Sequence, residues 1–187
     1  VTFGENKQCD FCLTDFNFDL QVPGKFNLMN ALAALALLAN LGFQEEKIIA
    51  ALKEFKSTKR RFELVKETPE LLHFDDYAHH PSEILAVIDT LNEKFGKVKK
   101  LIAFQPHTFS RTRQLFTDFV DALAKNTQAQ DEILLIDIFP SAREAYDHEM
   151  NCDLLVEAVK NKYPNCQIRN LHTIKALADF VKQTPHR

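Results

Sequence analysis

Residues 98–138, VKKLIAFQPHTFSRTRQLFTDFVDALAKNTQAQDEILLIDI, form the stretch that decides the fold. Two apolar runs of strand length, 98–104 and 132–138, flank a segment, 112–125, whose apolar residues recur at helical spacing. A strand, a helix and a second strand predict a unit with parallel strands, because the helix carries the chain back to the starting edge of the sheet. The sequence therefore predicts an α/β fold.

The same alternation extends from this unit in both directions. Further strand patterns occupy 62–66, 71–75 and 166–170, and further helix patterns occupy 82–95, 152–162 and 173–183. Strands that alternate with helices in this way form a mostly parallel sheet with helices on both faces. We expect such a sheet in the second part of the chain.

The residues before this region follow a different pattern. Residues 11–20 alternate as in a strand, which we expect to be antiparallel, with a bend near Thr14. Residues 27–39 are apolar on nearly every face, which predicts a helix buried on all sides. Residues 45–55 carry one apolar stripe and predict a second helix.

A polar linker separates the two regions. Residues 56–60 contain no apolar side chain, whereas the segments on both sides do. A strand and a pair of helices are too few elements to complete a domain of their own. We therefore predict a boundary between residues 1–57 and residues 58–187.

The composition indicates a folded protein and excludes two classes of partner. Of the 187 residues, 45% are hydrophobic and 26% are charged, which is sufficient for a buried core. The formal charge is -3, and no Lys/Arg cluster is long enough to follow a phosphate backbone, so we expect no nucleic acid partner. The longest apolar run, 31–39, is far shorter than the roughly 20 residues that cross a bilayer, so we expect no membrane segment.

The start of the chain and its cysteines indicate a cytoplasmic protein. The sequence begins VTFG, without Met or a signal-like stretch, so we expect further residues to precede it. The four cysteines are too few and too scattered for a disulfide framework. Cys9 and Cys12 form a CxxC pair, but Cys152 and Cys166 do not form a second one, so we expect ordinary buried thiols and no bound metal.

Three polar loops follow predicted strands, at 75–80, 105–111 and 141–144. Open parallel sheets bind ligands at the carboxyl ends of their strands, so we expect a site there. Carboxylates, imidazoles and guanidiniums suit a ligand that carries an anion together with a metal or an amine. A structural explanation stands beside this one, because His80 before a proline can cap a helix and Asp75 can accept from a backbone amide.

Adjacent residues in the first loop limit what it can bind. Asp75 and Asp76 would point to opposite faces of a strand, so at most one of them is expected to serve the ligand. His79 and His80 would diverge in the same way, and no third ligand stands at helical spacing from them. A permanent zinc site is therefore not expected here.

Five segments, in order along the chain, resemble motifs of the Mur ligases, the ATP-dependent amide-forming enzymes of peptidoglycan precursor synthesis. Residues 23–34, PGKFNLMNALAA, resemble the PGxHNxxNALAA motif, and residues 59–63, KRRFE, resemble the RRFE stretch. Residues 75–81, DDYAHHP, and 104–112, FQPHTFSRT, are similar to the DDYGHHP and FQPHxxxRT motifs of the branch that joins L-alanine to UDP-N-acetylmuramate. The SARE loop at 141–144 also fits that branch.

The resemblance implies that the two parts of the chain belong to different domains with different roles. Residues 1–57 would be the end of the central ATP-binding domain, a tail made of a strand and a helix pair. Residues 58–187 would be the Rossmann-like carboxy-terminal domain that admits the amino acid. ATP would phosphorylate the carboxylate of UDP-N-acetylmuramate, and L-alanine would attack the acyl phosphate, with magnesium offsetting phosphate charge. The sequence contains no GxxxxGK[ST] phosphate loop, so these residues alone are expected to be inactive.

The resemblance also implies residue roles. Arg111 would take the alanine carboxylate, with Tyr77 and His79 lining the same pocket, and His107, in the same motif as Arg111, would also bind the substrate. His79 is the catalytic candidate, since it could accept a proton from the ammonium of the amino acid. The positions that would contact the nucleotide are Asn27, Asn30, Arg61 and Asp76.

Some positions depart from the motifs, and alternatives stay open. Phe26 stands where the family usually has His, Thr108 replaces an Arg of some relatives, and Ala78 replaces a Gly. One alternative is the recycling ligase that joins a ready-made tripeptide to the same UDP-sugar. Another is a nucleotide- or amino-acid-binding module without catalysis. The sequence pattern leaves the oligomeric state open.

Overall fold

The computed structural model describes residues 1–56 and 58–184, and the chain divides into two compact units. The first unit comprises Val1–Lys66 and His73–Tyr77, and the second comprises Glu67–Leu72 and Ala78–Arg187. We predict the boundary between residues 57 and 58, and residue 57 is not among the described residues. The boundary therefore remains a prediction.

A three-stranded parallel sheet is the centre of the second unit. Strands β5 (Leu101–Phe104), β6 (Glu132–Leu135) and β7 (Gln167–Asn170) pair in the order β5-β6-β7. Phe104 is level with Leu135, and Leu135 is level with Asn170, so the three strands end at the same height. The predicted α/β fold with a parallel sheet is confirmed.

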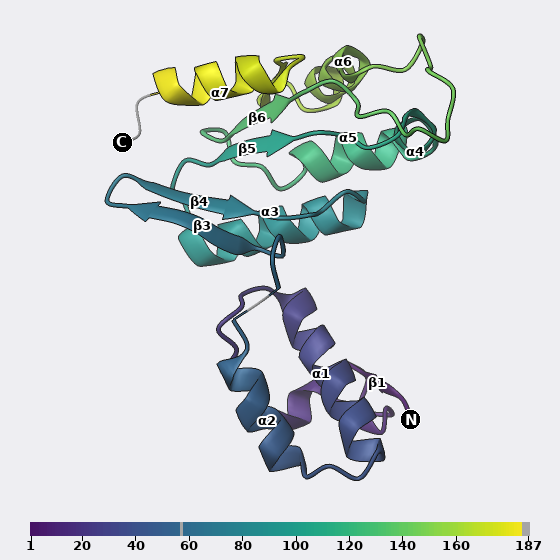
Figure 1. The fold of residues 1–187 in the computed structure, drawn as a ribbon, viewed down its shortest axis with the longest axis vertical. Helices are drawn as coiled ribbons and strands as arrows, with labels where there is room; N and C mark the ends of the chain where they lie inside the picture. The colour runs from purple at the N-terminus through teal and green to yellow at the C-terminus, as the bar shows by residue number, and fades with distance from the viewer. Residues whose placement is uncertain (57, 185–187) are drawn as a thin grey trace. The chain divides into compact units, whose positions relative to one another are not determined.

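Five helices in residues 58–184 accompany this sheet. They are α3 (Pro81–Phe95), α4 (Phe109–Gln114), α5 (Phe116–Ala124), α6 (Cys152–Lys162) and α7 (Ile174–Gln183). Figure 1 shows α3 and α5 side by side along the sheet. None of the helices in the described residues combines the length and the hydropathy that a membrane-spanning helix needs.

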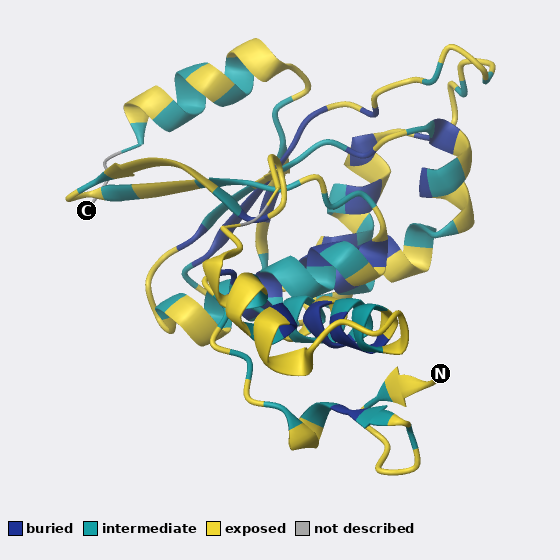
Figure 2. Cartoon of the chain, turned by 60° about the horizontal axis from the view of Figure 1, so that its bottom comes forward, coloured by how far each residue is buried: buried dark blue, intermediate teal, exposed yellow. Residues whose placement is uncertain are grey.

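The core of the second unit forms on one face of the sheet, and α7 covers the other. Ile133, Leu135 and Ile168 of the sheet are buried in one cluster with side chains of α3, α5 and α6. Strand neighbours point to opposite faces, so Arg169 lies on the far side from Ile168. There its guanidinium carbon is 5.2 Å from the ring centroid of Phe180 in α7, a helix with no buried residue (Figure 2). Helices thus cover both faces, as predicted.

The helix predicted at 112–125 differs from the structure at its start. The chain becomes helical already at Phe109, breaks at Leu115, where φ is -107° and ψ is 23°, and continues as α5. Arg111 therefore lies within a short helix and not in a loop. The sequence pattern missed α4 because its first turn is held by a side chain 34 residues further along.

Strands β3 (Glu63–Thr68) and β4 (Leu71–Asp75) form a separate two-stranded sheet close to the predicted positions. Only two residues join them, so they make a hairpin. At its turn, the backbone N–H of Leu71 donates to Thr68 Oγ1 over 3.1 Å.

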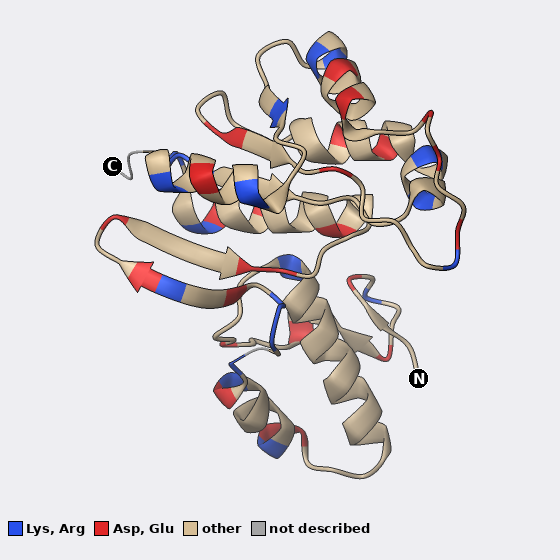
Figure 3. Ribbon diagram, turned by 45° about the horizontal axis from the view of Figure 1, so that its top comes forward, with Lys and Arg blue, Asp and Glu red and all other residues tan. Residues whose placement is uncertain are grey.

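The first unit contains the predicted helix pair, α1 (Lys25–Asn40) and α2 (Glu45–Glu54). Figure 3 shows α1 almost without charged residues. Its buried residues, Ala31, Leu32, Leu35 and Ala36, form one face. Leu37, at 61% exposure, lies outside that face, so the prediction of a helix buried on all sides was wrong for the described structure. The elements that pack against α1 in this unit reach only part of its surface.

The strand predicted over 11–20 is also wrong beyond its start. Strand β2 (Phe11–Cys12) pairs with β1 (Phe3–Gly4), and the pairing is parallel, not antiparallel. A 3₁₀ turn, η1 (Leu13–Asp15), then occupies the place of the predicted bend, and no strand resumes.

Ring stacking explains the aromatic pattern that suggested a strand there. The ring centroids of Phe11 and Phe16 lie 6.0 Å apart, as do those of Phe16 and Phe18. The alternating aromatic residues therefore stack on one another and do not mark two faces of a strand.

We predict that Leu155→Ala lowers the free energy of unfolding by about 2–5 kcal/mol, because a fully buried side chain leaves a cavity. Leu154→Ala is the matched control, since its side chain is the next along α6 and is 38% exposed. Urea unfolding of the 187-residue chain, followed by circular dichroism, measures both. Equal losses would contradict the buried face assigned to α6.

Candidate functional site

The loops that follow β5 and β6 are bound to each other at the carboxyl ends of the strands. Gln105 Nε2 donates to the carbonyl oxygen of Asp137 over 2.8 Å. The backbone N–H of Phe139 donates to the carbonyl oxygen of Pro106 over 2.9 Å, and the backbone N–H of Thr108 donates to the carbonyl oxygen of Phe139 over 3.0 Å. Because the two strands end level with each other, these bonds continue the sheet by one further bridge.

His107 lies in this bridge. It pairs with Phe139 in a parallel bridge, and the two rings stack with centroids 5.5 Å apart and an interplanar angle of 13°. The contact fixes the plane of the imidazole at the edge of the sheet.

Thr108 has a strained backbone. Its φ is 70°, a left-handed value that a β-branched residue rarely adopts. Its own side chain holds the turn, because Thr108 Oγ1 accepts from the backbone N–H of Arg111 over 3.3 Å. The Thr112 hydroxyl donates to the carbonyl oxygen of Thr108 over 2.8 Å. The side chain and the carbonyl oxygen of Thr108 therefore both accept hydrogen bonds from α4, and these bonds hold the turn directly before the helix.

Glu144 completes the first turn of α4 from the other loop. Its Oε1 accepts from the backbone N–H of Phe109 over 2.9 Å, and its Oε2 accepts from Ser110 N–H over 3.2 Å and from the Ser110 hydroxyl over 2.9 Å. The backbone N–H of Ser141 also donates to Oε1, over 3.2 Å. The polar loop at 141–144 therefore stabilises the segment that follows β5, at the start of α4.

These bonds favour the charged form of the carboxylate. Desolvation raises the pKa of Glu144, but the hydrogen bonds from the backbone of Ser110, Ser141 and Phe109 and from the Ser110 hydroxyl outweigh it. The result is a pKa of Glu144 lowered to about 2.

Arg111 is half-buried in the third position of α4. Arg113, two residues further, points to another side of the helix and binds Asp147, with Nη2 2.6 Å and Nε 3.0 Å from Oδ2. The guanidinium of Arg111 forms no ion pair with any residue that the structure describes. The two arginines of this helix therefore differ in their surroundings.

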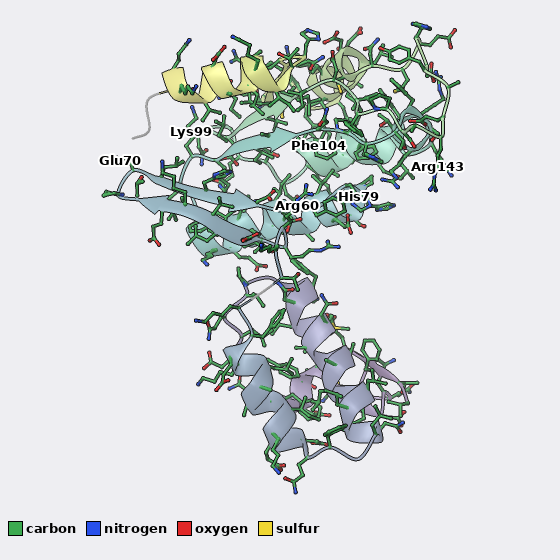
Figure 4. All side chains as sticks on the ribbon, in the orientation of Figure 1. Arg60, Glu70, His79, Lys99, Phe104 and Arg143 are labelled. Carbon is green, nitrogen blue, oxygen red and sulfur yellow. The ribbon has the colours of Figure 1, made fainter. Side chains whose placement is uncertain are left out.

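The first polar loop leads into α3, where Glu83 organises two histidines. Glu83 Oε2 accepts from the backbone N–H of His79 over 2.9 Å and of His80 over 3.1 Å, and it lies 3.4 Å from Nδ1 of His79. His80 caps the helix through its own side chain, which accepts from Ser82 N–H, so its structural explanation is confirmed. Figure 4 shows His79 at the start of α3.

Tyr77, Asp76 and Arg61 belong to the first unit. Tyr77 is 49% exposed, and its ring centroid lies 4.7 Å from the guanidinium carbon of Arg60 and 6.0 Å from that of Arg61. Asp76 Oδ2 accepts from the backbone N–H of Phe62 over 2.7 Å.

The structure assigns a backbone role to Asp76 that the sequence suggested for its neighbour. Asp75 instead approaches the Arg60 side chain, with 3.6 Å between Oδ2 and Nε. Asp76 would therefore contact the nucleotide, as predicted, while its carboxylate also accepts the hydrogen bond from the backbone N–H of Phe62.

Asn27 and Asn30 occupy the first turns of α1. Asn27 is half-buried, and its side-chain amide donates to the carbonyl oxygen of Pro23 over 2.6 Å. Asn30 is exposed one turn later. The segment before them turns at Gly24, where φ is 99°, a value that glycine adopts without strain.

The structure brings some predicted site residues together and leaves one combination as a prediction. His107 and Arg111 share one bonded segment, and His79 lies in the same unit. Tyr77 belongs to the other unit, so the pocket predicted from Tyr77, His79 and Arg111 stays a prediction. Among the described residues, no group of three or more His, Cys, Asp or Glu side chains could hold a metal ion.

Sequence patterns assigned no role to Glu144, although its loop was among the polar ones. Its partners lie 34 and 35 residues earlier, and nothing in a sequence pattern pairs positions at that distance. Figure 4 shows the neighbouring Arg143 on the same segment, an exposed residue.

Comparison with known proteins identifies the family of this sheet and its loops. Residues 60–185 match the family described as Mur ligase, glutamate ligase domain. A UDP-N-acetylmuramate--L-alanine ligase of Flavobacterium psychrophilum is 45% identical over 150 residues, which are 80% of this chain and 32% of that protein. One of Desulfitobacterium hafniense is 33% identical over 203 residues, covering 98% of this chain and 44% of that protein.

A solved structure agrees with this result. The crystal structure of the UDP-N-acetylmuramate-alanine ligase of Thermotoga maritima has a TM-score of 0.62 and 30% identity, and the match covers 83% of this chain and 31% of that one. The chain thus spans less than half the length of the relatives it matches.

We predict that Glu144→Gln destabilises the 187-residue chain at neutral pH and that the difference from the unchanged chain disappears in acid. The folded-state pKa is about 2, below the ordinary value of 4.5, so the charged form stabilises the fold above about pH 4.5. This contribution is lost as the pH falls from about 4.5 to about 2. Urea unfolding at a series of pH values measures it.

Glu149→Gln is the control for this experiment, because the Glu149 side chain lies on the same loop and is 88% exposed. It should change stability little at any pH. A Glu144→Gln difference that stays constant from pH 7 to pH 2 would contradict the proposed charge on Glu144.

Proposed function

Since this chain belongs to the Mur ligase family, we propose that the complete protein is an ATP-dependent ligase that joins L-alanine to the carboxylate of UDP-N-acetylmuramate in peptidoglycan precursor synthesis. Relatives that carry this activity in their names support the choice of substrates. The observation that carries the proposal is the turn at Thr108, which fixes the backbone of Arg111 beside the carboxyl ends of β5 and β6.

The amino acid must be held by its carboxylate while its amine is aimed. A guanidinium offers two parallel N–H donors in the plane that a carboxylate accepts, which fixes direction as well as distance. Arg111 in the third position of α4 provides such a fork on a backbone tied by Thr108. We assign the alanine carboxylate to Arg111. Holding both reactants in place then accounts for a large part of the rate.

The amine attacks only as the free base, so a proton must leave the ammonium of the bound amino acid. We assign its acceptance to His79. Glu83 lies beside Nδ1 of this ring, and a carboxylate at one ring nitrogen favours the tautomer that leaves Nε2 free to accept. Tyr77 and the stacked ring of His107 would line the same pocket.

ATP would supply the phosphoryl group that activates the substrate carboxylate, with magnesium offsetting phosphate charge. The sequence has no GxxxxGK[ST] phosphate loop, so the main phosphate contacts would come from other residues of the complete protein. We propose that residues 1–57 are the end of the ATP-binding domain, with Asn27, Asn30, Arg61 and Asp76 near the nucleotide. These 187 residues alone would not ligate, and the complete protein would act in the cytoplasm.

In the complete protein, Arg111→Ala should raise the KM for L-alanine by about 10-fold to 100-fold and change the KM for ATP little, because only the amino acid loses its anchor. Steady-state kinetics with UDP-N-acetylmuramate, ATP and varied L-alanine measure this. Arg113→Ala is the matched control, since that arginine stands on the same helix and is bound to Asp147.

An unchanged KM for L-alanine in Arg111→Ala would remove Arg111 from the pocket. The same assay with a tripeptide as acceptor separates the recycling ligase, since an enzyme that uses the tripeptide and not L-alanine would overturn the substrate that we propose. No turnover of either acceptor would favour a binding module.

A further inference from the structure

The carboxylate of Glu144 connects two loops that lie far apart in the sequence. It reaches across 34 and 35 residues to the backbone of Ser110 and Phe109, and it accepts from the Ser110 hydroxyl as well. The residue next to these donors is Arg111. Glu144 itself stands too far along the chain to belong to the FQPHTFSRT motif.

The first turn of a helix has backbone N–H groups without partners inside the helix. In α4, two of them, at Phe109 and Ser110, are bound by Glu144. The next, at Arg111, is bound by Thr108 Oγ1, and the one at Thr112 is bound by the carbonyl oxygen of Thr108. Every backbone N–H group of this turn therefore has an acceptor. Glu144 provides it for Phe109 and Ser110, and Thr108 provides it for Arg111 and Thr112.

Helix α4 has six residues, too few to be stable without outside contacts. It also starts from a strained residue, Thr108. The orientation of its first turn must therefore come from contacts with the loop after β6. Glu144 binds that turn, and the ring of Tyr146 packs edge-on against Phe109 at 4.8 Å, whereas Asp147 binds Arg113 beyond the first turn.

We propose that Glu144 is a positioning residue for the amino-acid step: it fixes the first turn of α4 and thereby aims the guanidinium of Arg111 at the carboxylate of the incoming amino acid. The inference rests on the proposed function, because it needs Arg111 to bind that carboxylate. Glu144 acts through the backbone and touches no substrate itself.

A carboxylate is the group this position requires. Four donors point at its two oxygens: the Ser110 hydroxyl and three backbone N–H groups, and an N–H group cannot accept a hydrogen bond. A glutamine would place an N–H₂ group against a backbone N–H, so the turn would have to shift. A shift of about 1 Å at a binding group can cost about 100-fold in rate.

The test compares Glu144→Gln with Asp147→Asn in the complete protein. Asp147→Asn is the matched control, because it weakens the bond from the same loop to the same helix at Arg113 and leaves the first turn intact. Kinetics with L-alanine, ATP and UDP-N-acetylmuramate varied in turn give three KM values, and thermal unfolding gives stability. We expect Glu144→Gln to raise the KM for L-alanine at least about 10-fold and to leave the other two KM values within about 2-fold.

A second variant guards against a general loss of structure. Ser110→Ala removes one donor to Glu144 without a charge change, and it should raise the KM for L-alanine in the same direction by a smaller factor. The proposal is overturned if the KM for L-alanine stays unchanged in Glu144→Gln while the unchanged protein ligates L-alanine. It is also overturned if Asp147→Asn raises that KM equally, or if all three KM values rise together.

The same assays also test the proposed function itself. If the unchanged protein ligates no amino acid, both the function and this inference fall. If it ligates L-alanine and Arg111→Ala has no effect while Glu144→Gln does, Glu144 does not act through Arg111. These outcomes are distinguishable in one series of assays.

Discussion

The common height at which β5, β6 and β7 end is the constraint on which the rest of the site depends. Phe104, Leu135 and Asn170 are in register, so the chain leaves each strand at the same edge. Segments that start about 30 residues apart in sequence are thereby brought within hydrogen-bonding distance, as the bridge between His107 and Phe139 demonstrates. The assignments of His107, Arg111 and Glu144 all use this register.

The elements that could be predicted are those that short-range patterns determine. Apolar spacing located the three parallel strands and the helices that cover them, because burial on one face imposes a period on the sequence. The helix cap at His80 was recognisable from the proline that follows it. Motif position selected His79, His107 and Arg111, and the structure places all three near the ends or starts of regular elements.

What could not be predicted depends on long-range partners or on surroundings. The first turn of α4, which contains Arg111, is bound by Glu144, and no local pattern connects Glu144 to that turn. The aromatic residues at 11–18 alternate as in a strand but stack ring on ring instead. The apolar composition of α1 suggested burial on every side, yet the sequence cannot say how much of that surface its neighbours reach.

The central claim is a direct contact between the guanidinium of Arg111 and the carboxylate of the amino acid. Ethylamine is L-alanine without its carboxylate, so the ratio of kcat/KM for L-alanine to that for ethylamine measures what the carboxylate contributes. We predict that this ratio is at least about 10-fold smaller in Arg111→Ala than in the unchanged protein, since a charge-assisted pair is lost. An equal ratio in the two proteins would contradict the contact.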